Sequence, residues 1–382
     1  MESSTSRTSL NCISLADPDT QRSVALLKQA CLDSGFFYVL DHGISQEFMD
    51  EVFAESKKFF ELPNSEKMKL LRNEKNRGYT PMLDEILDPE NQVNGDYKEG
   101  YYIGVEVPAE DPQSNRPFYG PNQWPSEEVL PKWREVMEQY HREALRVAKS
   151  VARIIALALN LDEDFFDRPE MLGDSIATLR LLHYEGQVSN PSKGVYGAGA
   201  HSDYGLITLL ATDDVVGLQI CKDRNAQPQV WEYVAPVKGG FIVNLGDMLE
   251  RWSNSIFRST LHRVVLDGQE RYSIAFFVEP SHDCVVECLP TCKSETNPPK
   301  FAVSLSDQVP PNHLLGVPIP ALQGHTRRSE HLQRRQSLKE EALVFALFLF
   351  LPSHLSSMTC NVASGNKNAL SKEDGNVVLL MC

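Results

Sequence analysis

The spacing of apolar residues predicts a helix-containing N-terminal part. Apolar positions recur at helical intervals from Val24 to Cys31 and again from Phe48 to Phe60, and the run 36–40 between them predicts a strand. A long amphipathic helix is predicted from about 126 to 160, because its apolar stripe is typical of a helix packed on a core. Shorter elements are a strand at 9–16, a charged helix at 62–75, a turn at 77–79 and a strand at 98–103.

From Ser175 onward the pattern changes to short apolar runs separated by Gly, Asp, Asn and Pro. These runs predict seven strands, at 177–184, 205–212, 217–222, 231–236, 239–246, 258–266 and 271–280. Short strands at such spacing indicate an antiparallel sandwich or jelly roll. The sequence has no G-x-G-x-x-G or P-loop motif, which argues against a nucleotide-binding Rossmann fold. The intervening segment 82–125 is irregular, and we expect it to form loops that face a substrate.

Composition excludes several functional classes. The chain has 382 residues, 42% hydrophobic and 23% charged, as in ordinary globular enzymes. The formal net charge of −15 argues against binding to nucleic acid or to anionic membranes. Neither a signal-peptide core nor the roughly 20 apolar residues of a membrane span is present in the sequence. We therefore expect a cytoplasmic protein whose eight cysteines are reduced.

The candidate chemistry lies in the strand-rich part. His201 and Asp203 are two positions apart, so a strand, or its end, would direct both side chains to one face. Two imidazoles and one carboxylate form the ligand set that leaves Fe(II) open on the opposite side, and His262 is the candidate for the third ligand. Arg271 and Ser273 could together bind a carboxylate. Taken singly, each residue is more often structural or exposed; the order and spacing together favour a site.

Other chemically suggestive residues are assigned structural roles. His42 follows an apolar strand and a turn, where a structural histidine is expected. Cys284, Cys288 and Cys292 recur every fourth residue, but zinc sites use closer pairs, so we interpret this spacing as incidental. The predicted long helix has a basic face that we expect to be solvated, formed by Arg142, Arg146, Lys149 and Arg153.

The motifs together resemble a known family. The sequence HSD…LHRVV…RYS resembles the H-x-D…H…R-x-S signature of Fe(II)- and 2-oxoglutarate-dependent dioxygenases, in the plant-type branch that includes isopenicillin N synthase. The run GFFYVLDHGI and the segment 244–264 resemble the same branch, except that Ser255 replaces a common Gly. The resemblance covers roughly residues 8–300. It implies a mostly β, α+β protein: a double-stranded β-helix (jelly roll) core with an N-terminal elaboration of helices and strands.

The resemblance also assigns roles to individual residues. It implies that Fe(II) is held by His201, Asp203 and His262. It implies further that 2-oxoglutarate, as co-substrate, is bound by Arg271 and Ser273, with Tyr184 nearby. The implied reaction couples oxidative decarboxylation of 2-oxoglutarate, to succinate and CO₂, with O₂-dependent oxidation of a small organic metabolite, such as hydroxylation. We expect a monomer.

Four segments follow from these patterns. They are an N-terminal dioxygenase segment at 8–125, a support helix and linker at 126–172, the catalytic jelly roll at 173–300, and a divergent, partly disordered C-terminal tail at 301–382.

Several alternatives remain open from the sequence. R-x-S also occurs in oxidases of this branch that do not use 2-oxoglutarate, and some members use ascorbate. A catalytically silent isoform could act as a binding module, and a zinc hydrolase could use a His/Asp/His site but would leave the R-x-S motif unexplained. The substrate, and whether it is hydroxylated, desaturated, demethylated or cyclised, cannot be deduced from the residues.

Overall fold

A computed structural model describes residues 8–305, which form a mostly β fold built on two facing sheets. The large sheet has eight strands in the order β1-β2-β10-β7-β12-β5-β4-β3. Its strands are β1 (Cys12–Ser14), β2 (Phe36–Leu40), β3 (Gly78–Thr80), β4 (Glu99–Ile103), β5 (Ile176–Tyr184), β7 (Ile207–Thr212), β10 (Phe241–Leu245) and β12 (Arg271–Glu279). The large sheet therefore combines strands from the N-terminal part of the chain (β1–β4) with strands from residue 176 onward.

The small sheet has four strands in the order β6-β11-β8-β9. They are β6 (Ala198–His201), β8 (Leu218–Asp223), β9 (Val230–Tyr233) and β11 (His262–Val264). A further pair, β13 (Val285–Val286) and β14 (Ser304–Leu305), lies outside both sheets. The antiparallel pairing within the small sheet, and its packing on the large one, confirm the predicted jelly roll.

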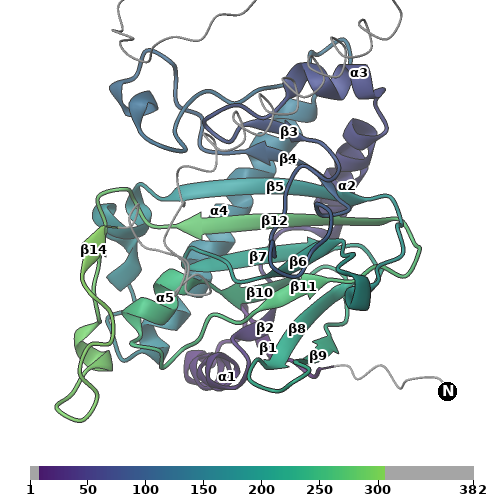
Figure 1. The fold of residues 1–382 in the computed structure, drawn as a ribbon. Coiled ribbons are helices and arrows are strands. Elements are labelled where there is room, and N and C mark those ends of the chain that lie inside the picture. The colour runs from purple at the N-terminus through teal and green to yellow at the C-terminus, as the bar shows by residue number, and fades with distance from the viewer. Residues whose placement is uncertain (1–7, 306–382) are drawn as a thin grey trace, which may run out of the picture. The chain divides into compact units, whose positions relative to one another are not determined.

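Helices cover the face of the large sheet that is turned away from the small one (Figure 1). They are α1 (Thr20–Asp33), α2 (Gln46–Phe60) and α4 (Trp133–Ala158). The two shorter helices are α3 (Asn64–Lys67) and α5 (Asp247–Trp252), of which α5 contacts β13. The apolar stripe of α4 is fully buried against β5, β7 and β12, as its periodicity predicts. Burial of large side chains such as Trp133, Tyr140 and Phe276 in this layer fixes the sheet on which the site is built.

The long helix is shorter than predicted. We expected it from 126 to 160, but α4 begins at Trp133. Lys132 adopts a left-handed conformation at its N-cap, with φ of 63°. Pro131 disfavours helical geometry at the residue before it, so the segment 126–132 forms turns instead.

Two other local predictions were wrong, and one strand was missed. The charged segment 62–75 contains only the one-turn helix α3 and a 3₁₀ turn at Met68–Leu70, because Arg72 pairs by its backbone N–H with the carbonyl of Tyr79. Gly78–Thr80 forms strand β3 because it pairs antiparallel with β4, where only a turn was predicted. The sequence pattern also missed β6, whose residues Ala-Gly-Ala-His carry almost no strand signal.

The described residues all lie in the first of two units of the chain, Met1–Ala321, and Leu322–Cys382 lies outside the description. The predicted tail 301–382 falls outside it from residue 306 onward, and the four-segment division stays a prediction. Within residues 8–305, no helix has the length and apolarity needed to span a membrane.

Candidate metal centre

The structure brings His201, Asp203 and His262 together at one edge of the small sheet. His201 ends β6, Asp203 follows it, and His262 begins β11, where it pairs directly across from His201. The Oδ1 atom of Asp203 lies 3.7 Å from Nε2 of His201 and 3.6 Å from Nε2 of His262. Among the described residues this is the one His/Cys/Asp/Glu group whose ligand atoms all lie within 4.8 Å of one another.

Both imidazole rings direct Nε2 toward Oδ1 of Asp203. Nδ1 of His201 lies 2.9 Å from the carbonyl oxygen of Gly199, and Nδ1 of His262 lies 3.1 Å from that of Thr260. A carbonyl oxygen only accepts, so each Nδ1 carries a proton, and Nε2 is the nitrogen of each ring that faces Asp203. Burial, and then the neighbouring His262, lower the pKa of His201 to about 4. The His201 ring is therefore neutral at pH 7, as metal ligation requires.

Asp203 is oriented by two neutral donors from the large sheet. Its Oδ2 atom accepts hydrogen bonds from Thr208 Oγ1 at 2.5 Å and from Asn244 Nδ2 at 2.7 Å. Burial alone would raise its pKa, but the two histidines and these hydrogen bonds hold the pKa of Asp203 below its ordinary value. One carboxylate oxygen is therefore anchored, and the other is left to face the two imidazoles.

Arg271 and Ser273 lie together on β12, in the same cavity as the three candidate ligands. The guanidinium of Arg271 is 1% exposed; it donates to Ser273 Oγ at 3.2 Å and to the carbonyl of Val215 at 3.2 Å. It lies over the ring of Tyr184, 5.1 Å from the ring centroid, since Tyr184 is its cross-strand partner on β5. No carboxylate within residues 8–305 forms an ion pair with Arg271.

This arrangement fits an anionic ligand. A buried, uncompensated guanidinium is costly unless an anion joins it. Arg271 and the adjacent hydroxyl of Ser273 offer a carboxylate both charge and several hydrogen-bond donors. The three residues predicted beside a co-substrate therefore converge on one place, between the two sheets and next to the His/Asp/His group.

The rest of the cavity wall is largely apolar. It is lined from the two sheets and from the loop before β4 by Leu87, Leu182, Leu210, Leu218, Val264, Ala275 and Phe277. Alternate residues of facing strands point into the space, as in any β-sandwich interior. The loop contribution of Leu87 and Lys98 accords with the expectation that the segment 82–125 faces a substrate.

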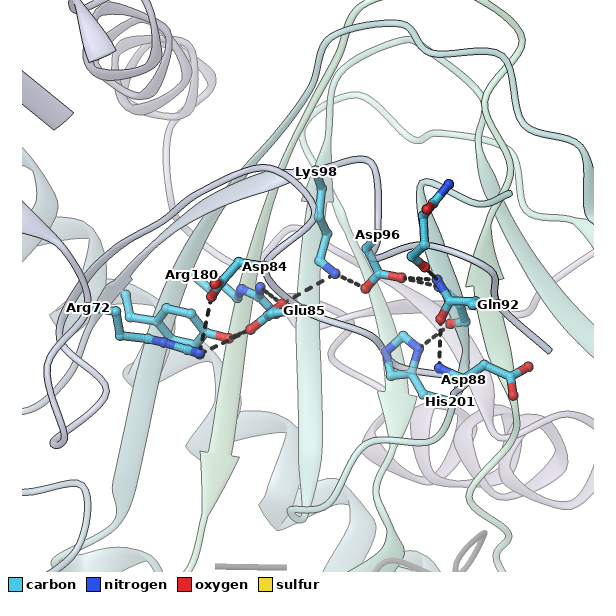
Figure 2. A network of polar contacts seen from close by, with 12 residues as sticks. Arg72, Asp84, Glu85, Asp88, Gln92, Asp96, Lys98, Arg180 and His201 are labelled. Atoms are coloured by element: carbon cyan, nitrogen blue, oxygen red, sulfur yellow. Dashed lines mark hydrogen bonds and ion pairs between the residues drawn. The ribbon is translucent and has the colours of Figure 1, made fainter. Parts of the chain in front are cut away.

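Two further cations reach this cavity, but both are paired. Lys98 forms ion pairs with Asp96 and Glu85, and Arg180 forms one with Glu85. Arg72 also contacts Glu85, at 3.1 Å, and Asp84, at 3.8 Å. Figure 2 shows these side chains meeting beside His201.

Glu85 is the centre of this ionic network. Burial would raise its pKa, yet Arg180, Lys98 and Arg72 hold the pKa of Glu85 well below its ordinary value. Three cations and three carboxylates balance one another, so this wall of the cavity carries no net charge. Arg271 is therefore the cation left for a ligand.

Sequence reasoning missed the residues that support the site. Asn244 lies in the segment that resembles the dioxygenase branch, and Thr208 lies on a predicted strand two positions from Leu210. Both could therefore have been proposed as residues that support the site. Glu85 and Asp96 lie in an irregular segment where no periodicity indicates which side chains turn inward.

His42, the three recurring cysteines and the basic face of α4 have the following surroundings. His42 contacts the carbonyl of Gly239 at 3.0 Å through Nε2 and accepts from the N–H of Ile44 through Nδ1. Cys284, Cys288 and Cys292 are buried free thiols that join no potential metal site within the described part of the chain. On the basic face of α4, Arg146 and Arg153 are about half exposed and pair with Glu143 and Asp167.

Two family models match the chain. Residues 10–127 match the non-haem dioxygenase N-terminal family named for morphine synthesis, and residues 176–280 match the 2OG-Fe(II) oxygenase superfamily. Members of the superfamily use Fe(II) and 2-oxoglutarate. The donor set described above, two imidazoles and one carboxylate beside an arginine without an ion pair in the described residues, suits both groups.

Curated relatives agree with these matches. The chain is 53% identical over 300 residues to an azadirone synthase LFS of Melia azedarach, covering 78% of this chain and 90% of the relative. It is 54% identical over 293 residues to a kihadalactone A synthase LFS of Citrus sinensis, covering 76% and 87%.

Solved structures show the same fold. A full-length Neurospora crassa protein, solved in complex with alpha-KG, has 31% sequence identity and a TM-score of 0.66, covering 78% of this chain and 93% of that one. A structure of JOX2 in complex with 2OG, Fe and JA has 29% identity and a TM-score of 0.63, covering 81% and 86%.

Proposed function

Because the chain belongs to the Fe(II)- and 2-oxoglutarate-dependent oxygenases, we propose that it oxidises a small organic metabolite at the cavity between its two sheets. The one observation that supports this site most strongly is the position of Arg271. It is a buried cation without a carboxylate partner in the described chain, and it shares a cavity with His201, Asp203 and His262.

We propose that His201 Nε2, His262 Nε2 and Asp203 Oδ1 hold Fe(II). Arg271 and Ser273 bind the far carboxylate of 2-oxoglutarate, and Tyr184 packs against the guanidinium and keeps it in place. Fe(II) with 2-oxoglutarate supplies O₂ activation at this point, with release of succinate and CO₂. The protein contributes the orientation of the ligands, the charge of Arg271, and an apolar wall that excludes water.

The relatives support a class of substrate. Two proteins more than 50% identical to this chain are named as synthases of azadirone and of kihadalactone A. We propose that this chain acts on a precursor of a compound related to one of these products. The neutral, mostly apolar cavity wall supports a substrate without a strong charge. A monomeric state and a cytoplasmic location stay predictions from the sequence.

The test measures succinate and substrate oxidation together. The purified protein with Fe(II), O₂ and 2-oxoglutarate should form succinate, and succinate formation should rise when extracts containing candidate precursors are added. His201→Ala or Asp203→Ala should abolish both Fe(II) retention and turnover, because each variant removes one of the three ligands. Turnover of 2-oxoglutarate by either variant with iron retained would disprove the ligand assignment.

The same assay separates the alternatives. An oxidase that does not use 2-oxoglutarate would oxidise substrate with ascorbate present and release no succinate. A binding module without activity would retain Fe(II) but form no succinate. It would leave 2-oxoglutarate unchanged both with candidate substrates and without them.

A further inference from the structure

A loop that lines the cavity contacts the strand carrying His201 through one residue, Gly199. The N–H of Gly199 donates to Asp96 Oδ1 at 2.9 Å, and its carbonyl accepts from His201 Nδ1 at 2.9 Å. Both backbone groups of one residue therefore connect a loop carboxylate with a candidate metal ligand. This contact joins residues separated by about a hundred positions in the sequence.

The loop packs against Gly199 without any space. A Cβ atom at position 199 would lie 2.1 Å from Oε1 of Gln92 and 3.0 Å from Cβ of Asp88. A larger residue at this position would force the side chain of Gln92 to move. The close approach is a second, independent indication that the loop and the His201 strand are held as one unit.

Asp96 is itself held firmly. It is 0% exposed, and its Oδ1 atom also accepts from Gln92 Nε2 at 2.8 Å, while its Oδ2 atom pairs with Lys98. Figure 2 shows Asp96 between Lys98 and Gln92, on the side of the network nearest His201. A buried carboxylate with partners on both oxygens has one orientation, and it can fix the direction of the N–H that it accepts.

We propose that Asp96 is a positioning residue for the metal centre, which acts through Gly199 to fix the tautomer and orientation of His201. This rests on the proposed role of His201 as an Fe(II) ligand. Because Leu87 and Lys98 of the same loop line the cavity, the loop that contacts a substrate is mechanically connected to a ligand of the metal. The simpler explanation is that Asp96 only stabilises the loop, and the two explanations predict different results.

Asp96→Ala and Asp96→Asn form a matched pair in the full-length protein. Both remove the ion pair with Lys98, but asparagine keeps an oxygen that accepts from the Gly199 N–H. If Asp96 acts through Gly199, alanine should impair His201 and asparagine should restore it. If Asp96 only stabilises the loop by charge, both variants should behave alike.

Two measurements follow His201 without relying on activity. In metal-free protein labelled with ¹⁵N-histidine, the His201 signals should show Nδ1 protonated in the wild type and in Asp96→Asn, and a mixture of tautomers in Asp96→Ala. Titration with Co(II), followed by its visible absorption, should show a dissociation constant raised about tenfold in Asp96→Ala. This is the lower end of the roughly 10–100-fold loss of affinity found when a residue that orients a metal ligand is removed. Asp96→Asn should bind Co(II) as the wild type does.

Equal Co(II) affinity and identical histidine signals in the wild type and Asp96→Ala would overturn the proposal, as would equal losses in the two variants. If Asp96→Ala does not fold, Gln92→Ala replaces it; this variant loosens Asp96 and should shift the His201 tautomer in the same direction, and no shift counts against the proposal. A wild-type protein that fails to bind Co(II) would contradict the assignment of the metal site, and the tautomer measurement would still decide the role of Asp96.

Discussion

Two walls of the cavity hold buried charge in opposite ways. On strand β12, Arg271 is buried with hydrogen bonds to Ser273 and to a carbonyl, but with no ion pair among the residues described. On the opposite side, Lys98 of the loop before β4 and Arg180 of β5 are also buried and are paired with Glu85 and Asp96. The first arrangement is complete only when an anion binds, whereas the second is complete in the folded chain.

The two walls differ in whether a buried cation has a carboxylate partner within the described chain. Burial alone does not distinguish Arg271 from Arg180, because both are less than 10% exposed. The presence of a carboxylate partner does distinguish them. A buried ion pair is tolerated only while both partners are present. Removing one partner leaves the other charge buried without compensation, which destabilises the fold.

The largest expected effect comes from breaking the ion pairs of Glu85. Glu85→Gln should lower the free energy of unfolding by about 3–5 kcal/mol, the usual cost of leaving buried cations without their partner. Because the folded-state pKa of Glu85 is depressed, its contribution is fully present above the unfolded pKa of about 4.3 and is lost as pH falls toward the folded pKa. Urea denaturation of the wild type and variant at pH 7 and at pH 4 measures this. A difference that does not shrink on acidification would contradict it.

The next largest effect is expected at Arg271. Arg271→Met should raise the KM for 2-oxoglutarate roughly 30-fold or more, since losing one partner of a buried charge pair costs about 2–5 kcal/mol. The ligand-free variant should unfold no more easily than the wild type, because the variant removes an uncompensated buried charge. Steady-state kinetics and urea denaturation check both parts. A large loss of stability in the absence of ligand would show that Arg271 has a structural role after all.

The smallest effect concerns Asp203, whose Oδ2 atom is held by neutral donors. Thr208→Val removes one of its two hydrogen bonds and leaves that from Asn244, so the dissociation constant for Co(II) should rise about tenfold. Thr212→Val, on the same strand, is the matched control and should leave Co(II) affinity unchanged. Equal affinities in the wild type and Thr208→Val would show that Asn244 alone orients the carboxylate.

The part of the site that lies on strands could be predicted from local sequence patterns. Short apolar runs between turn residues marked β5, β7, β10 and β12. The fixed side-chain direction along a strand made His201/Asp203 and Arg271/Ser273 recognisable as pairs. The helix periodicity of α4 likewise marked the core layer, although its start depended on Pro131 and the left-handed Lys132.

The residues that surround these pairs could not be predicted in the same way. Which carboxylate meets which cation depends on how an aperiodic loop folds over the sheets, and no local rule links Glu85 to Arg180 or Asp96 to Gly199. The orientation of His201 depends on that loop as well. Local spacing specifies the direction of a side chain on a regular element, but a buried charge is compensated by contacts between distant segments that form only when the chain is folded.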